Sequence, residues 1–211
     1  MAEPSGICGV DTIEKYGISP HLLCWIKQGN ATVVGILGQG SSRSLMAQWT
    51  APMENPDIGL GITDYAKGTA QAMSGATAIT TFSTTQVWSG NSPMKFNLVL
   101  DFFAIDDAVS QVMRPLEWLE QFASPQVNGW SPFDPTNWKA GGSGNATGRI
   151  PQRVTLDIGR KMIIPECVIE NVSIPLDKER DSSGNLIRAQ VTIDVQTLCM
   201  LNRDIVSKTY I

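Results

Sequence analysis

The hydrophobic pattern between Gln86 and Pro125 predicts a strand that leads directly into a helix. Apolar and polar residues alternate from Lys95 to Ile105, and a period of two is typical of a strand with one buried face. From Asp106 onward, apolar residues recur every three or four positions, as in an amphipathic helix. Pro115 interrupts this stripe, so we expect a kinked helix whose second segment starts with the proline in its first turn. The apolar stripe of such a helix must be buried against a sheet.

Alternating segments elsewhere predict the other strands. They are Ala31–Leu37, Ser44–Trp49, Ala78–Trp88, Arg153–Ile158, Met162–Leu176 and Leu186–Leu201. The glycine-rich segment 38–42 has the composition of a hairpin loop between the first two strands. Ile18–Ile26 is compatible with either a helical turn or a buried edge. Six to seven strands with one flanking helix predict a mainly β fold, either a barrel or a sandwich.

We predict a single domain over residues 1–211, with an irregular N-terminal arm at 1–30 and a C-terminal tail at 202–211. Two long excursions, residues 50–75 and 126–150, separate the strands and are rich in glycine and proline. Long connections of this kind in a compact domain are usually functional or ordered by a partner. We therefore expect both excursions to act as intersubunit loops.

Aromatic residues in the excursions mark a predicted interface. Trp130, Phe133 and Trp138 lie in the second excursion and Tyr65 lies in the first. Flexible linkers rarely carry aromatic residues, whereas the cores of protein interfaces favour them. The alternatives are that these rings pack on the barrel of their own chain or form a platform for a sugar or a base.

Composition limits the classes of function. The charged share is 17%, against about 25% in typical soluble domains, which indicates a surface covered by partners or rich in small polar residues. The net charge of −4 disfavours a surface that grips nucleic acid. We found no apolar run long enough to span a bilayer.

No group of residues predicts catalysis, a metal or a cofactor. Asp101, Asp106 and Asp107 are close in sequence, but the last two stand where a helix begins and are expected to cap it. His21 has no recognisable catalytic partner, and we expect it to be packed or at the surface. The four cysteines have no metal-ligand spacing. They are Cys8, Cys24, Cys167 and Cys199.

A set of short motifs carries a resemblance to a known family. They are Trp88-Ser89-Gly90, Pro115-Leu116 with Leu119, Ile158-Gly159, and Val168-Ile169-Glu170-Asn171-Val172-Ser173. Together with the order of strand, helix, glycine-rich loop and β meander over residues 86–201, they resemble baseplate hub and tail-tube proteins of contractile-tailed bacteriophages. The resemblance does not separate tube protein, tube initiator and hub adaptor.

Membership of this family implies a tail-tube-like barrel, and a ring, usually of six copies, around a channel for DNA ejection. The implied partners are copies of the chain and the neighbouring tail-tube, hub-spike and baseplate proteins, in a virion assembled in the host cytoplasm. DNA would pass through without sequence-specific binding. The last strand would then turn its polar side to the lumen. That side carries Arg188, Gln190, Thr192, Asp194 and Gln196.

Two other kinds of protein fit the same sequence. A lone β-sandwich that binds a glycan or another ligand through Trp130 and Trp138 is one, and a secretion-system tube protein of the same fold is the other. An enzyme is the class with the least support, because we found no catalytic constellation.

Overall fold

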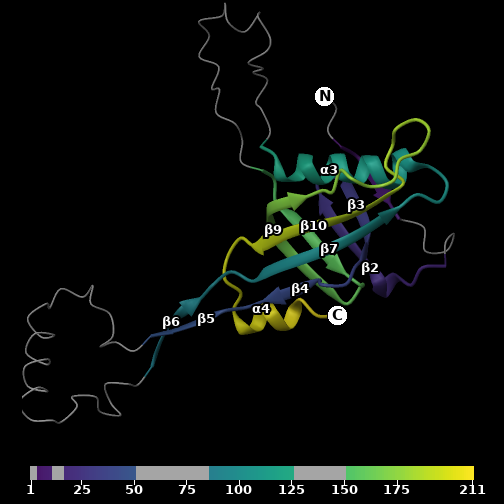
Figure 1. The fold of residues 1–211 in the computed structure, drawn as a ribbon. Helices are drawn as coiled ribbons and strands as arrows, with labels where there is room; N and C mark the ends of the chain where they lie inside the picture. The colour runs from purple at the N-terminus through teal and green to yellow at the C-terminus, as the bar shows by residue number, and fades with distance from the viewer. Residues whose placement is uncertain (1–3, 11–16, 51–85, 126–150) are drawn as a thin grey trace, which may run out of the picture. The chain divides into compact units, whose positions relative to one another are not determined.

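The computed structural model describes residues 4–10, 17–50, 86–125 and 151–211 (Figure 1). The chain divides into two compact units. The first contains Met1–Ser44 with Pro93–Ile211, and the second contains Leu45–Ser92. Within the described ranges, no helix is long and apolar enough to cross a membrane.

The first unit is a closed, six-stranded antiparallel barrel with two extra strands outside it, which confirms the mainly β prediction. Around the barrel the strand order is β3-β2-β8-β9-β10-β7, and pairing of β3 with β7 closes the circle through Ile36↔Asp101 and Leu37↔Leu100. Outside the barrel, β1 pairs with β3 and β4 pairs with β7. The bounds are β1 Gly6–Gly9, β2 Leu23–Gln28, β3 Ala31–Leu37, β4 Ser42–Ser44, β7 Lys95–Phe103, β8 Val154–Ile158, β9 Met162–Ser173 and β10 Arg188–Thr197.

The barrel core is formed by alternate residues of its strands, as the sequence pattern predicts. Phe96, Leu98, Leu100 and Phe102 of β7 are almost fully buried, and so are the alternate apolar residues of β10 from Ala189 to Val195. Each large apolar side chain removed from water stabilises the fold by roughly 1.5–3 kcal/mol. β7 and β10 are joined by nine residue pairs, so they bring two such rows together.

The flanking helix begins as a π-helix, η2 (Val109–Met113), and continues as α3 (Arg114–Ala123), which packs against β9, β1 and β3. The change of geometry falls at the predicted break. The Arg114 N–H donates to the Val109 carbonyl, five residues earlier, and the next residue, Pro115, has no N–H to donate.

The start of this helix is capped by Asp107, as predicted. Its carboxylate oxygens accept hydrogen bonds from the backbone N–H groups of Val109 and Ser110, both at 3.0 Å. Hydrogen bonds from the Ser110 side chain and from these backbone groups lower the pKa of Asp107. The buried stripe of α3 is Leu116, Trp118, Leu119 and Phe122, with Pro115 beside it.

The predicted hairpin between Ala31–Leu37 and Ser44–Trp49 is wrong. The second segment is divided between β4, which pairs with β7 as β3 also does, and β5 (Ala47–Thr50), which pairs with β6 (Val87–Asn91). Residues 38–41 form an irregular segment between β3 and β4. The Gly38 N–H donates to the Val99 carbonyl (2.7 Å), and the Ser41 hydroxyl accepts from the Val99 N–H (3.0 Å) and donates to its carbonyl (3.2 Å). A serine side chain thus replaces the missing backbone partner of β7.

The described part of the predicted irregular arm at residues 1–30 is more regular than expected, because it contains β1 and β2. The helical turn expected within Ile18–Ile26 is the short 3-10 helix η1 (Pro20–Leu22), and the buried strand β2 follows it. β2 is not an edge, because it pairs with both β3 and β8. The β2 sequence does not alternate because both of its faces are buried. Cys24 belongs to the main core, whereas Leu23 and Trp25 form a second apolar cluster with Val34.

The predicted C-terminal tail is bound to the barrel. It forms α4 (Arg203–Lys208), and the Asn202 side chain caps it by accepting from the Ile205 N–H at 2.8 Å. The following residues extend the sheet along β9. The Ile163 N–H donates to the Thr209 carbonyl (2.8 Å), and the Ile211 N–H donates to the Lys161 carbonyl (3.0 Å).

In the second unit, the described residues form a two-stranded antiparallel ribbon of β5 (Ala47–Thr50) and β6 (Val87–Asn91). Trp49 lies opposite Trp88, and both rings are about half exposed. The excursions at 50–75 and 126–150 lie outside the described residues except for Thr50. Isolated two-stranded ribbons are only marginally stable in water.

Candidate functional site

The five polar residues predicted on the last strand lie together on the outer face of β10. Arg188 and Gln190 are exposed, and Thr192, Asp194 and Gln196 are partly buried, whereas the residues between them point into the core. β10 lies between β7 and β9, and β4 borders β7. The outer sides of β4, β7, β10 and β9 therefore form one continuous polar face, which we call the polar face.

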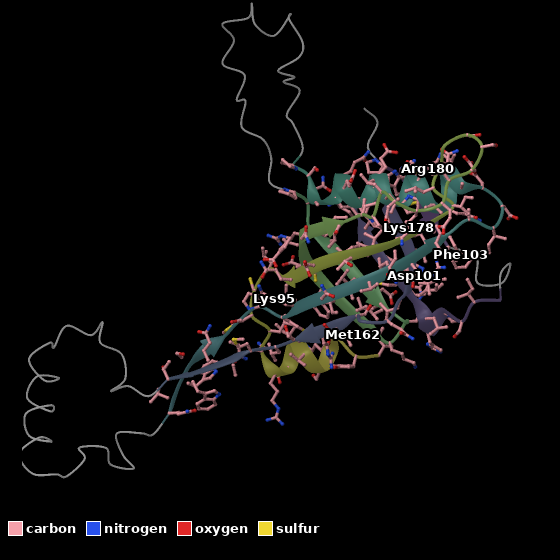
Figure 2. All side chains as sticks on the ribbon, viewed as in Figure 1. Lys95, Asp101, Phe103, Met162, Lys178 and Arg180 are labelled. Atoms are coloured by element: carbon pink, nitrogen blue, oxygen red, sulfur yellow. The ribbon has the colours of Figure 1, made fainter. Side chains whose placement is uncertain are left out.

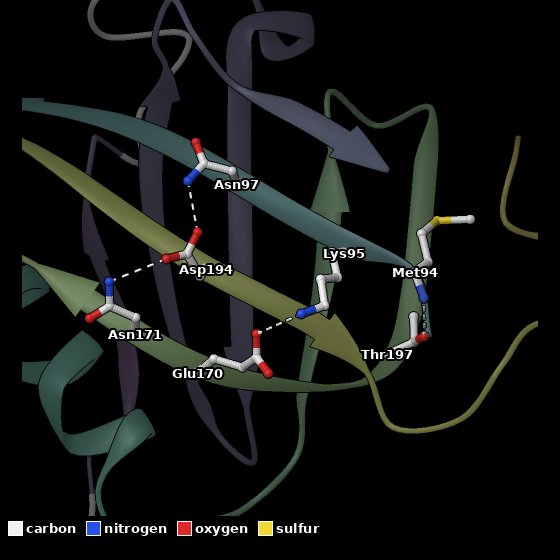
Figure 3. Close-up of polar contacts among 7 residues, drawn as sticks. All are labelled: Met94, Lys95, Asn97, Glu170, Asn171, Asp194 and Thr197. Atoms are coloured by element: carbon white, nitrogen blue, oxygen red, sulfur yellow. Dashed lines mark hydrogen bonds and ion pairs between the residues drawn. The ribbon is translucent and has the colours of Figure 1, made fainter. Parts of the chain in front are cut away.

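Asp194 is the centre of the polar face (Figure 3). Its register partners are Asn97 on β7 and Asn171 on β9. The Asn97 amide donates to one carboxylate oxygen at 2.7 Å, and the Asn171 amide donates to the other at 3.2 Å. These two bonds, with a smaller contribution from Lys95, hold the pKa of Asp194 below its ordinary value, although burial opposes them. The carboxylate is therefore ionised at neutral pH.

The same type of pair recurs further along β10. The Gln190 amide donates to Asp101 on β7 at 3.0 Å, and these two residues are register partners. In both places a neutral amide, rather than a cation, satisfies an aspartate. Amide donors satisfy the lone pairs of a carboxylate but leave its charge in place.

One ion pair lies at the end of the polar face near the start of β7. Lys95 Nζ is 3.8 Å from Glu170 Oε2, and both side chains are more than one-third exposed (Figure 3). Exposed pairs of this kind contribute about 0–1 kcal/mol. Arg188 stands at the opposite end, beside Phe103.

The end of β10 is fixed to the start of β7 by Thr197 (Figure 3). Its hydroxyl accepts from the Met94 N–H at 3.0 Å and donates to the Cys199 carbonyl at 2.8 Å, and its own N–H donates to the Met94 carbonyl at 3.0 Å. Thr197 is buried. These bonds set the register that places Asp194 opposite Asn97.

A depression of about 430 Å³ lies over this part of the polar face. Its lining residues are polar except for Phe96 and Val195, whose side chains are buried in the barrel core. The polar lining residues are Ser42, Ser44, Lys95, Asn97, Glu170, Asn171 and Asp194. This set offers hydrogen-bond donors and acceptors and one weak ion pair, between Lys95 and Glu170.

The other candidate groups have structural roles. Nδ1 of His21 lies 2.8 Å from the Gly159 carbonyl and joins η1 to the turn between β8 and β9. Burial, with a smaller effect of the Asp157 charge, raises the pKa of Cys24 to about 12, and burial raises that of Cys167 to about 12. These thiols are neutral and unreactive. Over the part of the chain that the structure describes, no three His, Cys, Asp or Glu side chains are grouped to hold a metal ion.

The predicted interface residues Tyr65, Trp130, Phe133 and Trp138 lie outside the described residues. Sequence reasoning placed Asp194 on a polar side but missed its partners. Asn97 and Asn171 are the outward residues of two other strands, and only the strand register brings them to the carboxylate.

No protein-family model matches this chain, and no curated protein is significantly similar to it.

Proposed function

We propose that this chain is a non-enzymatic structural protein of a contractile phage tail, in the baseplate hub or the tube-initiating ring. Several copies would surround a channel for DNA ejection, and the polar face would line that channel. The observation that carries the proposal is the pair of aspartates held by neutral amides. This arrangement keeps negative charge on a wide, hydrated sheet face.

The electrostatics of the polar face suit passage of DNA better than its capture. A surface that binds DNA neutralises phosphates with Lys and Arg. Here Lys95 is already beside Glu170, and Asp101 and Asp194 have amide donors instead of cations. A phosphate backbone near such a wall is repelled rather than held.

Unpaired strand edges on both sides of the polar face support a ring. On one side, β7 is the single partner of β4 within the described ranges. On the other, residues 168–173 of β9 pair only with β10 among the strands that the structure describes. Neighbouring copies would continue the sheet at these edges, which also removes exposed edges from solution. The resemblance to tail proteins implies six copies.

Negative-stain electron microscopy of the purified protein tests the ring. We expect closed rings with a central hole, and a monodisperse monomer at all concentrations would refute the ring. The lumen assignment has its own test, the double variant Gln190→Lys with Gln196→Lys. Its rings should retain duplex DNA at low salt, whereas wild-type rings should not. The matched control is Glu117→Lys with Glu120→Lys on the exposed side of α3, which should not retain DNA.

A lone ligand-binding module is the second candidate, and the polar depression over β7, β10 and β9 supports it. This protein would be a monomer whose tryptophan fluorescence changes on titration with a glycan. A secretion-system tube protein would share the ring and the polar face, and the neighbouring genes would distinguish it from a phage protein.

A further inference from the structure

Two carboxylates lie on the polar face at separate points along β7 and β10. Asp194 is opposite Asn97 and Asp101 is opposite Gln190, so the two pairs are four residues apart along both strands. Because a strand rises about 3.3 Å per residue, the two pairs are roughly 13 Å apart. Figure 2 shows Lys95 and Asp101 toward opposite ends of β7, and Asp194 lies near the Lys95 end (Figure 3). The polar face thus carries two separate negative points.

The first carboxylate, that of Asp194, lines the depression of about 430 Å³ and can accept further hydrogen bonds. Each of its oxygens takes one amide bond, at 2.7 Å from Asn97 and 3.2 Å from Asn171, and a carboxylate oxygen can accept two. Because the NH₂ groups of both asparagines face Asp194, their carbonyl oxygens remain as further acceptors in the same depression. This end of the polar face therefore suits a cationic donor.

The second carboxylate, that of Asp101, has free space beside it because residue 38 is a glycine. One oxygen accepts from the Gln190 amide at 3.0 Å. A Cβ at position 38 would lie 2.8 Å from the other oxygen, Oδ2, and 3.1 Å from Cγ1 of Val99. Any larger residue there would crowd Oδ2. Asp101 is only partly buried, so its carboxylate is also accessible from solvent.

The stretch between the two carboxylates is less polar than its ends. Val99 and Thr192 are register partners there, and both side chains are partly buried on the polar face. The neighbouring Ser41 hydroxyl already bonds the Val99 N–H and carbonyl. The methyl groups of Val99 and Thr192 can pack against methylene groups of a ligand and remove them from water. This stretch therefore suits an alkyl chain.

A fixed cation stands beyond each carboxylate. Lys95 follows Asp194 along the polar face and is 3.8 Å from Glu170, and Arg188 follows Asp101 and is opposite Phe103. Like charges repel, so both cations disfavour a polycation that extends past the carboxylates. They limit the length of a cationic ligand, and they also weaken its binding.

We propose that the polar face binds a linear polyamine of about the length of spermidine. One terminal ammonium group binds Asp194 in the depression, the other binds Asp101, and the methylene groups between them lie over Val99 and Thr192. The negative charge that repels phosphate attracts ammonium groups in the same way. All of these residues belong to one copy of the chain, so the site goes beyond the proposed ring and does not require it.

Calorimetric titration with amines of different length tests the site. Two diamines of equal charge are compared, diaminooctane and diaminobutane, each with an amino group at both ends. Diaminooctane and spermidine are long enough to reach both carboxylates, whereas diaminobutane reaches one. The long amines should bind about fivefold more tightly, because they form one additional surface ion pair. In Asp101→Asn they should lose this advantage, while diaminobutane binding should change little.

Two further variants separate a specific site from general attraction. Asp177→Asn removes the same charge from an exposed loop and should bind every amine like the wild type. Lys95→Gln removes a neighbouring cation, so it should bind the amines more tightly than the wild type, which a merely structural role of Lys95 would not explain. Lys95 is exposed, and circular dichroism checks that each variant is folded.

Three results would overturn the proposal. The first is equal affinity of the wild type for the long and the short diamine, or no binding of spermidine at millimolar concentration. The second is an equal loss of binding in Asp101→Asn and Asp177→Asn, which would indicate general attraction by net charge. The third is unchanged or weaker binding of the amines to Lys95→Gln.

Discussion

Replacing Asp194 by Asn tests the central contact of the polar face. The carboxylate accepts one amide hydrogen bond on each oxygen, from Asn97 and Asn171. An asparagine at position 194 keeps one acceptor oxygen, but its NH₂ group replaces the other oxygen. That NH₂ group would face the amide NH₂ of Asn97 or Asn171, and two donors cannot form a hydrogen bond. One hydrogen bond is lost while the shape of the side chain is nearly unchanged.

The structure sets both the size and the pH dependence of the effect. A hydrogen bond to a charged group contributes about 1.5–3 kcal/mol when buried, and because Asp194 is only partly buried we expect Asp194→Asn to cost about 1 kcal/mol at pH 7. Hydrogen bonds from Asn97 and Asn171 lower the pKa of Asp194 in the folded state. Its stabilisation is therefore complete above the unfolded pKa, about 3.9, and is lost as the pH falls through the folded pKa.

Urea unfolding of both proteins between pH 7 and pH 3 measures this difference. Wild type and Asp194→Asn should differ at pH 7 and converge at the acid end. Asp177→Asn makes the same charge change on an exposed loop and should stay within about 0.5 kcal/mol of the wild type. Equal stability of wild type and Asp194→Asn at pH 7, or a gap that widens in acid, would refute the reasoning.

Three further predictions concern other parts of the barrel. Arg160 has a left-handed φ of 56° and donates to the buried Asp157 at 2.6 Å. In urea unfolding, Arg160→Ala should lower the unfolding free energy by about 2–4 kcal/mol because it removes the donor. Arg160→Gly should lower it by about 1 kcal/mol less, because glycine adopts a left-handed φ without strain. Equal losses of unfolding free energy in the two Arg160 variants would exclude a contribution of the left-handed backbone conformation. Ser41→Ala should cost about 1 kcal/mol by removing the bonds to Val99, and a neutral result would mean that water replaces the hydroxyl. A thiol reagent should modify Cys199 alone in the native protein and all four thiols in urea, and rapid reaction of a second thiol would contradict the burial.

The sequence predicts those parts of the fold in which one face of an element meets water. β7, β10 and α3 each bury one side, so their periods of two or 3.6 are visible in the residue pattern. β2 has two buried faces and therefore no alternation. The segment at 38–41 has turn-forming residues, but composition does not tell whether the next strand folds back on β3 or continues along β7.

The candidate site was only half predictable for a related reason. Alternation along β10 assigns Asp194 to the polar side, because each strand carries its own pattern. The partners of Asp194 depend on how β10 aligns with its two neighbouring strands. Asn97 on β7 is 97 residues away in the sequence. On β9 the partner is Asn171, and the register shifts directly after this pair, between Asp194 and Val195. That alignment is set by the packing of the whole barrel and has no local signal. The phage-tail assignment stays a prediction that rests on the resemblance and the polar face.

The barrel is closed by a short ladder between β3 and β7, which we call the seam. It has two residue pairs, whereas the ladder between β7 and β10 has nine. Local opening of a sheet starts where the fewest ladder bonds must break. Hydrogen exchange should therefore reach the amide of Leu37, which lies beyond the end of the β2–β3 ladder, long before those in the middle of β10. The barrel would open transiently between β3 and β7 while β7, β10 and β9, which carry the aspartates, stay paired. The face proposed to meet DNA would therefore remain rigid during such openings.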